Sequence, residues 1–327
     1  MDSVNAVSID NALNLMNTFM SKEINLSHCK VIVFSEEIAK RGIRKEVSTL
    51  INNVQIRPDS NIIISTCSAE EYLKNVSPSL ENLVAKFYEI LPNSADYTGY
   101  TANVDLVNFF NRLISKTSEP VAILGSISTS SSPGDEELQQ KNKSTFDIEG
   151  GIKNIGLAVF KDDTMVGKLN ATETLNYLML TNQLKSCNIP VRNPEDENKV
   201  VDLFLTPNSK PKIKVSIING SPYVRINLQT NARISSIEDV TEGGNEEKMQ
   251  KIKDATSYYL KTQMENYLYR TAKEFHSDIS ELGKYSLTNF KTFPEFEEYQ
   301  WKNNYQDAFF DVNVDVSIRS GFLLTGS

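Results

Sequence analysis

The residues that could carry out chemistry are few in this sequence, and their spacing does not bring them together. The only two histidines are His28, just before a predicted strand, and His276, on a predicted helix. A histidine metal site or a Cys/His pair would need contacts that this spacing does not predict. We therefore interpret both histidines as surface or half-buried side chains.

The three cysteines, Cys29, Cys67 and Cys187, also lack the short spacing of a metal site. Their odd number excludes a complete disulfide framework. Cys29 and Cys67 lie in or beside predicted strands, so we expect them to be small buried hydrophobic side chains. The cysteine pattern therefore does not indicate whether the protein lies in an oxidising or a reducing compartment.

Short motifs indicate no catalytic site. Residues 125–130 resemble a phosphate-binding loop only in composition, because the lysine of a P-loop is missing, and no G-x-S-x-G motif occurs. Asp162-Asp163 is typical of a hairpin turn rather than a cation site. Trp301 is expected to pack against the core of its own domain. We predict no enzyme and no catalytic, cofactor-binding or metal-binding residues, and the partner-binding residues are unknown.

The elements that would position any site begin with an N-terminal α/β domain. Residues 30–34 and 61–66 read as continuous apolar strands, as in a parallel sheet that is buried on both faces. Between them, Ser35 can cap a helix that Gly42 interrupts and that continues over 43–54. This order predicts a right-handed βαβ unit. Other elements are expected at 9–20 (a helix capped by Ser8), from Ser68 to 91 (helical, interrupted by Pro78), at 104–114 (a helix) and at 120–124 (an edge strand).

The C-terminal part is organised around one long helix. From Asn245 to Leu282, apolar side chains recur in steps of three and four, and Gly283 is placed to end the helix. Such a helix would be about 55 Å long and needs cover from the rest of the protein. A coiled-coil arm or a partner-binding helix is the alternative, although the aromatic side chains are bulky for a coiled-coil seam.

Three alternating segments can provide this cover. Residues 212–218, 224–229 and 310–318 alternate apolar and polar side chains, which predicts an antiparallel sheet with one buried face. Asn219-Gly220 between the first two segments predicts a type I′ hairpin. A one-sided sheet on one long helix, at about 245–282, is an α+β domain.

We therefore expect a multi-domain α/β plus α+β protein in four parts. These are an α/β domain at 1–124, a flexible connection at 125–150, a hairpin-helix module at 151–190, and an α+β domain at 198–327 with the long central helix. In the middle module, strands at 157–160 and 165–169 precede a helix that is capped by Asn170 and ends at Leu184. Residues 188–198 are expected to be a loop.

Size and charge limit the function classes. The chain has 327 residues and a formal net charge of −8, so we expect no nucleic-acid partner. The sequence contains no run of about 18 apolar residues, so we expect no segment that spans a membrane. Residues 1–8 do not show the basic and apolar regions of a signal peptide.

Four ordered motifs carry a resemblance to a known family. They are residues 27–43 (SHCKVIVFSEEIAKRGI), Arg57-Pro58 with the strand at 61–66 and residues 68–71, residues 156–169 (GLAVFKDDTMVGKL), and residues 311–321 (DVNVDVSIRSG). Together they resemble the Ger(x)C family, the C-subunit lipoproteins of spore nutrient germinant receptors. The resemblance covers nearly the whole chain.

The resemblance implies a multi-domain α/β fold whose last domain wraps a sheet about a long helix. It also implies a non-catalytic protein, without a cofactor, that is needed for receptor assembly and nutrient-triggered germination. The implied partners are the polytopic membrane subunits of the receptor. The implied location is the outer face of the spore inner membrane, through an N-terminal lipid anchor.

One departure concerns this anchor. Family members begin with a signal peptide and a lipid-carrying cysteine, whereas Met1 here leads almost directly into the first helix. We expect a truncated, soluble chain without its anchor, and with an unpaired sheet edge in the first domain.

Two other functions stay open. The chain could be a small-molecule module that binds the germinant in a cleft near Gly125–Gly151. An enzyme such as a wall hydrolase would need convergent carboxylates, which the sequence does not locate.

Overall fold

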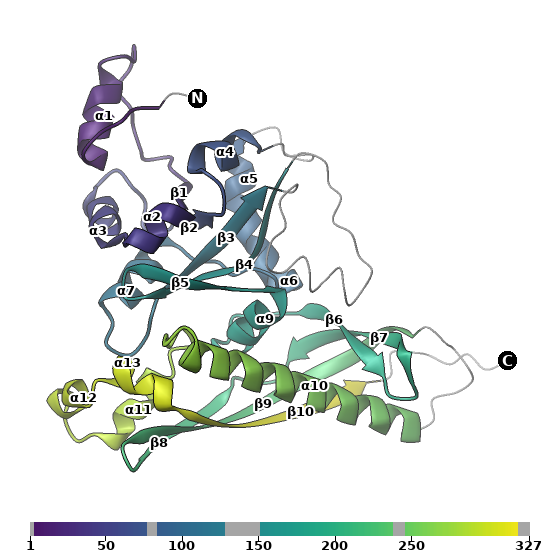
Figure 1. Cartoon of the computed structure of the whole chain (residues 1–327). Helices are drawn as coiled ribbons and strands as arrows, with labels where there is room; N and C mark the ends of the chain where they lie inside the picture. Colours follow the sequence, from purple (N-terminus) through teal and green to yellow (C-terminus); the bar gives the residue numbers. More distant parts are fainter. Residues whose placement is uncertain (1–2, 77–83, 128–150, 238–245, 320–327) are drawn as a thin grey trace.

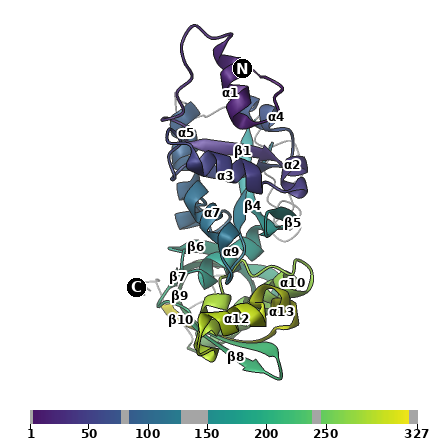
Figure 2. The same cartoon turned by 90° about the vertical axis from the view of Figure 1, so that its left-hand side faces the viewer.

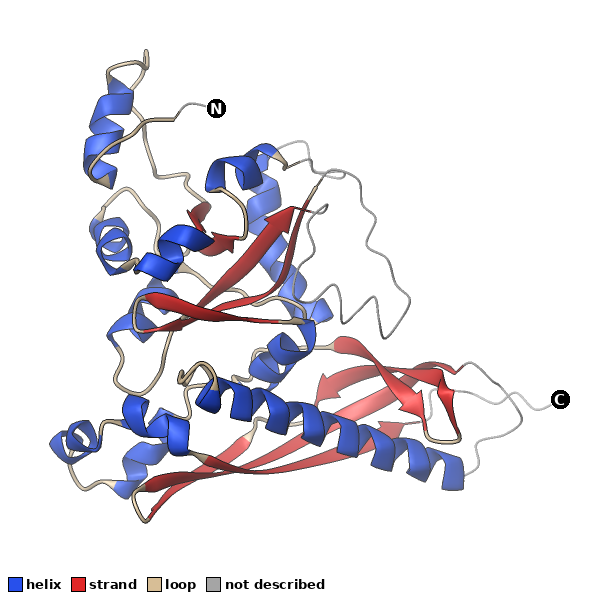
Figure 3. Cartoon of the chain, viewed as in Figure 1, coloured by secondary structure: helices blue, strands red, loops and turns tan. Residues whose placement is uncertain are grey.

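Two five-stranded sheets, one built by the first half of the chain and one by the second, form the framework of the protein (Figure 1). The structure is a computed structural model, and it describes residues 3–76, 84–127, 151–237 and 246–319. Helix α9 (Ala171–Leu180) lies between the two sheets, which are stacked along the long axis of the molecule (Figure 2). Helices and strands are mixed in both halves (Figure 3), so the expected α/β and α+β character is confirmed.

The predicted βαβ unit forms the beginning of the first sheet. Strands β1 (Val31–Ser35) and β2 (Asn61–Ser65) are parallel and are connected through α2 (Glu36–Arg41) and α3 (Arg44–Asn52). All five residues of β2 are buried, which explains its unbroken apolar sequence. Ser35 caps α2 as expected, since its side chain accepts a hydrogen bond from the amide of Ile38.

The strand expected at the sheet edge is instead the central strand. β3 (Val121–Ile127) pairs in parallel with β2 and antiparallel with β4 (Ile152–Lys161), which in turn pairs with β5 (Thr164–Leu169). Every residue of β3 is buried, as its position between two neighbours requires. The hairpin that we assigned to a module at 151–190 therefore completes the first sheet. The division of the chain into domains stays a prediction, and residues 128–150 of the expected connection lie outside the described residues.

Several helices accompany the first sheet. Ser8 caps α1 (Ile9–Asn17) as predicted, with its Oγ 3.2 Å from the amide nitrogen of Asn11. No side chain of α1 is buried, and the helix lies at one end of the molecule (Figure 2). Pro78, expected to interrupt a helix, lies outside the described residues. The other helices are α4 (Ala69–Lys74), α5 (Val84–Ile90), η1 (Leu91–Ser94), α6 (Ala95–Thr98) and α7 (Leu106–Ile114).

The second sheet begins with two strands where we expected a loop. Except for a turn at 194–195, residues 188–198 lie in β6 (Cys187–Asn193) and β7 (Asp196–Pro207), so the predicted loop is wrong. Alternate residues of β6 are buried, and Pro190 is tolerated because β6 is an edge strand that pairs with β7. Pro190 therefore marks a sheet edge, whereas Pro194 lies in the turn between β6 and β7.

The hairpin prediction is confirmed. β8 (Lys212–Ile218) pairs antiparallel with β9 (Ser221–Ile237), and both turn residues have positive φ, 51° for Asn219 and 85° for Gly220. This backbone conformation is the one that a type I′ turn requires.

The last strand corrects the expected strand direction. β10 (Phe309–Arg319) pairs with β9 in parallel, whereas we expected an antiparallel sheet throughout. The reason is that α10 (Glu246–Lys273) covers one face of the sheet (Figure 1) and carries the chain back to the starting end of β9. The alternation of β10 indicated one buried face and did not determine the direction of pairing.

The long helix is shorter than predicted. α10 ends at Lys273, and Gly283, expected to terminate it, is the first residue of α11 (Gly283–Ser286). His276 and Glu281 have positive φ, which no long helix accommodates. Phe275, Ile279 and Leu282 are buried as the apolar stripe indicated, but in a loop. The remaining elements are η2 (Leu287–Asn289), α12 (Phe293–Tyr299), α13 (Trp301–Asn304) and η3 (Tyr305–Asp307).

The hairpin turn gives a test of the backbone argument. Gly220 has φ 85° and no atom within 4 Å of an added Cβ, so Gly220→Ala should change the backbone energy alone. We expect a loss of about 1 kcal/mol in the free energy of unfolding, measured by urea denaturation. Gly151→Ala, which also adds its Cβ to open space but has no positive φ in that range, is the matched control and should be neutral or slightly stabilising. Equal effects of the two substitutions would contradict the turn assignment.

Candidate functional site: the junction between the two sheets

A loop after α10 connects the two halves of the protein. This segment, residues 274–282, which we name the junction loop, leaves the end of α10 and packs against the first sheet (Figure 1). The Oγ of Ser277 donates a hydrogen bond to the carbonyl of Phe160 at 2.6 Å. The Nζ of Lys161 donates to the carbonyl of His276 at 2.9 Å. The junction loop is thus fixed to the β4 strand at two successive residues.

Two glycines lie where neighbouring segments pack too closely for any side chain. A Cβ at Gly167 would lie 2.2 Å from the ring of Phe275, and a Cβ at Gly283 would lie 2.4 Å from the carbonyl oxygen of Thr117. Arg270 lies over the Phe275 ring, 4.7 Å from its centroid, and its Nη1 binds both oxygens of Glu173 at 2.6 and 2.7 Å. The chain at the end of α10 is thus held in close contact with α9 and β5.

Arg112 of α7 is the cation of the junction. Its Nη1 donates to the carbonyl of Ile279 at 2.8 Å, and its Nη2 bonds to the carboxylate of Glu281. The guanidinium also lies 5.8 Å from the ring centroid of Tyr177. Burial alone would raise the pKa of Glu281, but Arg112 and Lys284 outweigh burial and lower it. The Arg112–Glu281 pair is therefore ionised and charge-assisted.

Asp278 is a fully buried carboxylate at the centre of the junction loop. Its Oδ1 accepts from the amide of Leu282 at 3.0 Å, and its Oδ2 accepts from the amide of Gly283 at 2.7 Å and from the indole Nε1 of Trp301 at 2.8 Å. Burial raises the pKa of Asp278 to about 6 in spite of these three donors. The side chain links the junction loop to α11 and α13.

Glu119 is the second buried carboxyl, and it comes from the first half of the chain. Its backbone amide donates to the carbonyl of Asp278 at 2.9 Å. Its Oε2 lies 3.1 Å from Nζ of Lys302 and accepts from the amide of Asp162 at 2.8 Å. Within the described part of the chain, no group hydrogen-bonds to its Oε1. Burial raises the pKa of Glu119 to about 7, although Lys302 and the Asp162 amide lower it.

This arrangement can bind protons and fix the two sheets relative to each other. A carboxyl with a pKa near neutrality has the acidity of a general acid or base. The side chain of Glu119, however, has no exposed surface, and Asp278 is only 1% exposed, so both carboxyls face protein groups. We therefore describe the junction as a structural joint with two titratable carboxyls.

The residues singled out in the sequence lie in different places. Trp301 is buried in the core of its own half, as predicted, and Asp162 is a turn residue with φ 52°. Cys29 and Cys67 are half-buried rather than buried, and Cys187 is buried. His28 lies far along the chain from His276, which is part of the junction loop. Across the described ranges, no three His, Cys, Asp or Glu side chains are grouped as metal ligands.

Sequence reasoning missed the four charged residues of the joint. These residues are Arg112, Glu119, Asp278 and Lys302. Asp278 had a detectable signal, since it interrupts a stripe of otherwise apolar positions. Glu119 precedes a fully buried strand, which is the only indication that its carboxyl could be buried.

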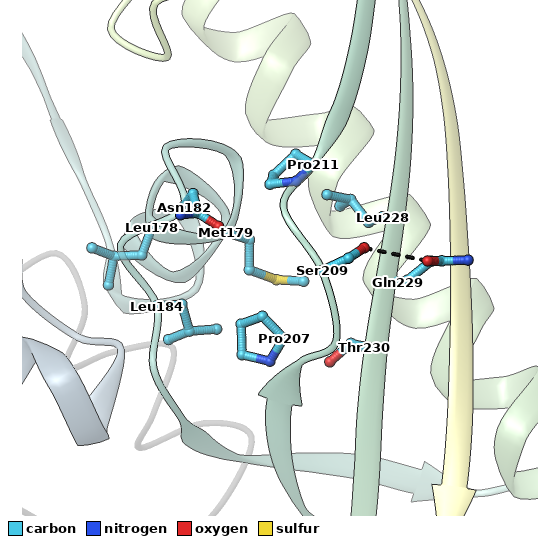
Figure 4. Close-up of a pocket in the computed structure, with 10 residues that line it drawn as sticks. All are labelled: Leu178, Met179, Asn182, Leu184, Pro207, Ser209, Pro211, Leu228, Gln229 and Thr230. Carbon is cyan, nitrogen blue, oxygen red and sulfur yellow. Dashed lines mark hydrogen bonds between the residues drawn. The ribbon is translucent and has the colours of Figure 1, made fainter.

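Cavities in the described structure are small or shallow. The hollow between α9 and strands β7 and β9 has a volume of about 10 Å³, enough for one water molecule (Figure 4). A larger hollow of about 270 Å³ lies between the segment around α1 and helix α3. The cleft that we expected near Gly125–Gly151 lies mostly outside the described residues. None of the described helices combines the length and apolar character that a membrane crossing needs.

Comparisons with known proteins identify two matching regions in chain order. The family described as "Spore germination protein N-terminal domain" matches residues 1–127, and "Spore germination B3/GerAC like, C-terminal" matches residues 155–321. The chain is 24% identical to a putative spore germination protein, YfkR, of Bacillus subtilis, over 99% of this chain and 79% of that protein. It is 20% identical to the spore germination protein GerQC of Bacillus cereus, over 91% and 76% of the two chains.

A solved structure shares the fold. The crystal structure of the GerBC protein superimposes with a TM-score of 0.61 at 15% sequence identity, covering 89% of this chain and 79% of that one. The two-sheet architecture therefore recurs in a protein with little sequence identity.

The raised pKa values predict how stability depends on pH. The pKa values of Glu119 and Asp278 rise from ordinary values of 4.5 and 3.8 to about 7 and about 6. Between pH 5 and 7 the folded protein then binds more protons than the unfolded chain, so the free energy of unfolding falls as pH rises and levels off above pH 7. We expect a difference of about 2 kcal/mol between pH 5.5 and pH 8 in urea denaturation. Glu119→Gln should reduce this difference. A higher free energy of unfolding at pH 8 than at pH 5.5 would contradict the raised pKa values.

The Arg112 contacts predict a second effect on stability. Arg112→Met leaves Glu281 without its buried cation and two carbonyl groups without a donor, so we expect a loss of about 3–5 kcal/mol. Lys185→Met is the matched control, because Lys185 and its partner Asp96 are 71% and 43% exposed and such a pair contributes less than about 1 kcal/mol. Comparable losses in the two variants would show that the junction pair is not specially important.

Proposed function

Because this chain belongs to the family of spore germination proteins with GerAC-like N-terminal and C-terminal domains, we propose that it is the non-catalytic, extracytoplasmic C subunit of a spore germinant receptor. In this role it is needed for receptor assembly and for nutrient-triggered germination. Its partners are the polytopic membrane subunits of the receptor. Its place is the outer face of the spore inner membrane, where an N-terminal lipid anchor attaches the native protein.

The observation that carries this proposal is that the two family regions together cover both sheets in chain order. Residues 1–127 include the parallel strands of the first sheet. Residues 155–321 include most of β4, all of β5, α9, the junction loop, α10 and the second sheet. Both halves of the family pattern are thus present and are connected through one joint. A receptor subunit that contacts several partners needs such a fixed relation between its surfaces.

The chemistry of the perturbed carboxyls supports a structural role. Glu119 and Asp278 bind Lys302, Trp301 and backbone amides within the joint. A single lipid chain gives only reversible membrane binding, so a second contact with the membrane subunits is required for a stable position.

The proposal is tested in spores of the strain that encodes this protein. After mild crosslinking of inner membranes, the tagged protein should be recovered together with two polytopic membrane proteins in a fixed ratio. Recovery of the tagged protein alone would contradict the assembly role. In a second measurement, deletion of the gene should abolish the nutrient response of that receptor while germination by nutrient-independent triggers continues. Normal nutrient germination of the deletion strain would exclude the proposed function.

A second candidate function is binding of the germinant itself. The observation in its favour is the hollow of about 270 Å³ beside α1, which is close in size to the smallest ligand sites. A ligand at 100 times its Kd stabilises a protein by about 2.7 kcal/mol. Amino acids and sugars that trigger the receptor should then raise the unfolding midpoint, and Ala12→Phe, which fills the hollow, should remove the effect. No shift with any of these nutrients excludes this function.

A further inference from the structure

The short helix α13 is attached to the joint by two successive side chains. Gln300, just before it, has a left-handed backbone with φ 53° and ψ 60°, which separates α13 from α12. Trp301 then donates its indole N–H to Asp278, and Lys302 places its ammonium 3.1 Å from Glu119. Both acceptors are buried carboxyls. The position of α13 therefore depends on two groups that can each gain a proton.

The two carboxyls are themselves connected. The amide of Glu119 donates to the backbone carbonyl of Asp278 at 2.9 Å, so the segment before β3 and the junction loop are in direct contact. A change at either carboxyl acts on the same one-turn helix, because Trp301 and Lys302 are neighbours in sequence. The cluster thus consists of α13, its contacts through Trp301 and Lys302, and the carboxyls of Asp278 and Glu119.

We propose that α13 is a proton-sensitive contact of the joint: ionised Asp278 and Glu119 bind Trp301 and Lys302 tightly, and proton uptake by these carboxyls loosens both contacts. Hydrogen bonds to an ionised acceptor are roughly twice as strong as those between neutral groups. Neutral carboxyls therefore lose about half of each contact. This inference goes beyond the proposed receptor role and does not depend on it.

Lys302 has an alternative partner in the loosened form. Its Nζ also lies 3.3 Å from the carboxylate of Asp162, whose side chain is 56% exposed. When Glu119 is neutral, the ammonium of Lys302 can turn toward the solvent and still pair with the carboxylate of Asp162. Trp301 has no such alternative in the described part of the chain, since its indole N–H is directed at Asp278.

Other titratable and charged groups surround the two carboxyls, including Tyr267 of α10 and Tyr305 of η3 near Asp278. From α7, Arg112 donates to the carbonyl of Glu119; Glu281 and its partner Lys284 lie beyond Asp278. From the β4–β5 hairpin come Asp162 and Lys161, and His276 lies in the junction loop itself. Among these groups, Glu119 and Asp278 are the carboxyls whose pKa values burial raises, to about 7 and about 6, so proton uptake falls between pH 8 and pH 5.5.

Trp301 provides the measurement, because it is the only tryptophan of the chain. The emission of the full-length folded protein is recorded from pH 8 to pH 5.5, with far-ultraviolet circular dichroism at each pH to verify the fold. We expect a red shift of the emission with one transition in this range while the circular dichroism stays constant. Hydrogen exchange of the Leu282 and Gly283 amides, corrected for its intrinsic pH dependence, should become about tenfold faster at pH 5.5.

Variants assign the transition to the two carboxyls. Asp278→Asn and Glu119→Gln imitate the neutral forms, so each should show the red-shifted emission already at pH 8 and a smaller transition. Glu298→Gln, on the exposed surface of α12, is the matched control and should behave as the unaltered protein. His276→Gln tests the histidine of the junction loop and should also leave the transition in place.

Three results would overturn the proposal. The first is a constant Trp301 emission in the unaltered protein between pH 8 and pH 5.5, which needs no variant to interpret. The second is a transition that disappears in His276→Gln but persists in Asp278→Asn and Glu119→Gln. The third is a red shift that accompanies loss of circular dichroism, because it reports unfolding rather than a local change at α13.

Discussion

The rest of the structure depends on the burial of charge between the two sheets. Arg112 and Glu119 come from one part of the chain, and Asp278 and Glu281 come from another. Arg112, Glu119 and Asp278 bind backbone groups that are buried in the joint, and Glu281 neutralises Arg112. Removing one charge from such a cluster leaves an uncompensated ion, which costs far more than an apolar contact. The geometry of the joint is therefore determined by hydrogen-bond directions rather than by apolar packing alone.

This constraint explains why α10 stops where it does. A helix that continued to Leu282 would keep its carbonyl groups for internal hydrogen bonds. In the actual structure, the carbonyls of His276, Asp278 and Ile279 accept hydrogen bonds from Lys161, the Glu119 amide and Arg112 instead. The left-handed residues His276 and Glu281 make these directions possible. The loop exchanges helical hydrogen bonds for bonds to α7, to β4 and to the segment before β3.

Local patterns predicted much of the fold, and contacts between distant residues explain the errors. The hairpin at Asn219-Gly220, the βαβ unit and the cap at Asn170 follow from neighbours in sequence and are confirmed. The parallel pairing of β10 and the central place of β3 depend on partners far along the chain. The apolar stripe of 245–282 was read correctly as buried, but periodicity cannot distinguish burial under a sheet from burial in a joint. The charged residues of the joint have no local motif, so sequence spacing could not assemble them.

The attachment of α10 to the joint has a mechanical consequence. The helix has 28 residues and is therefore about 42 Å long, with one end fixed beside the junction loop and the other at the far end of the second sheet. A rigid rod of that length acts as a lever arm, so a tilt of about 5° at the joint would move its distal end by roughly 4 Å. Because α10 packs along β10, such a tilt would carry the second sheet with it.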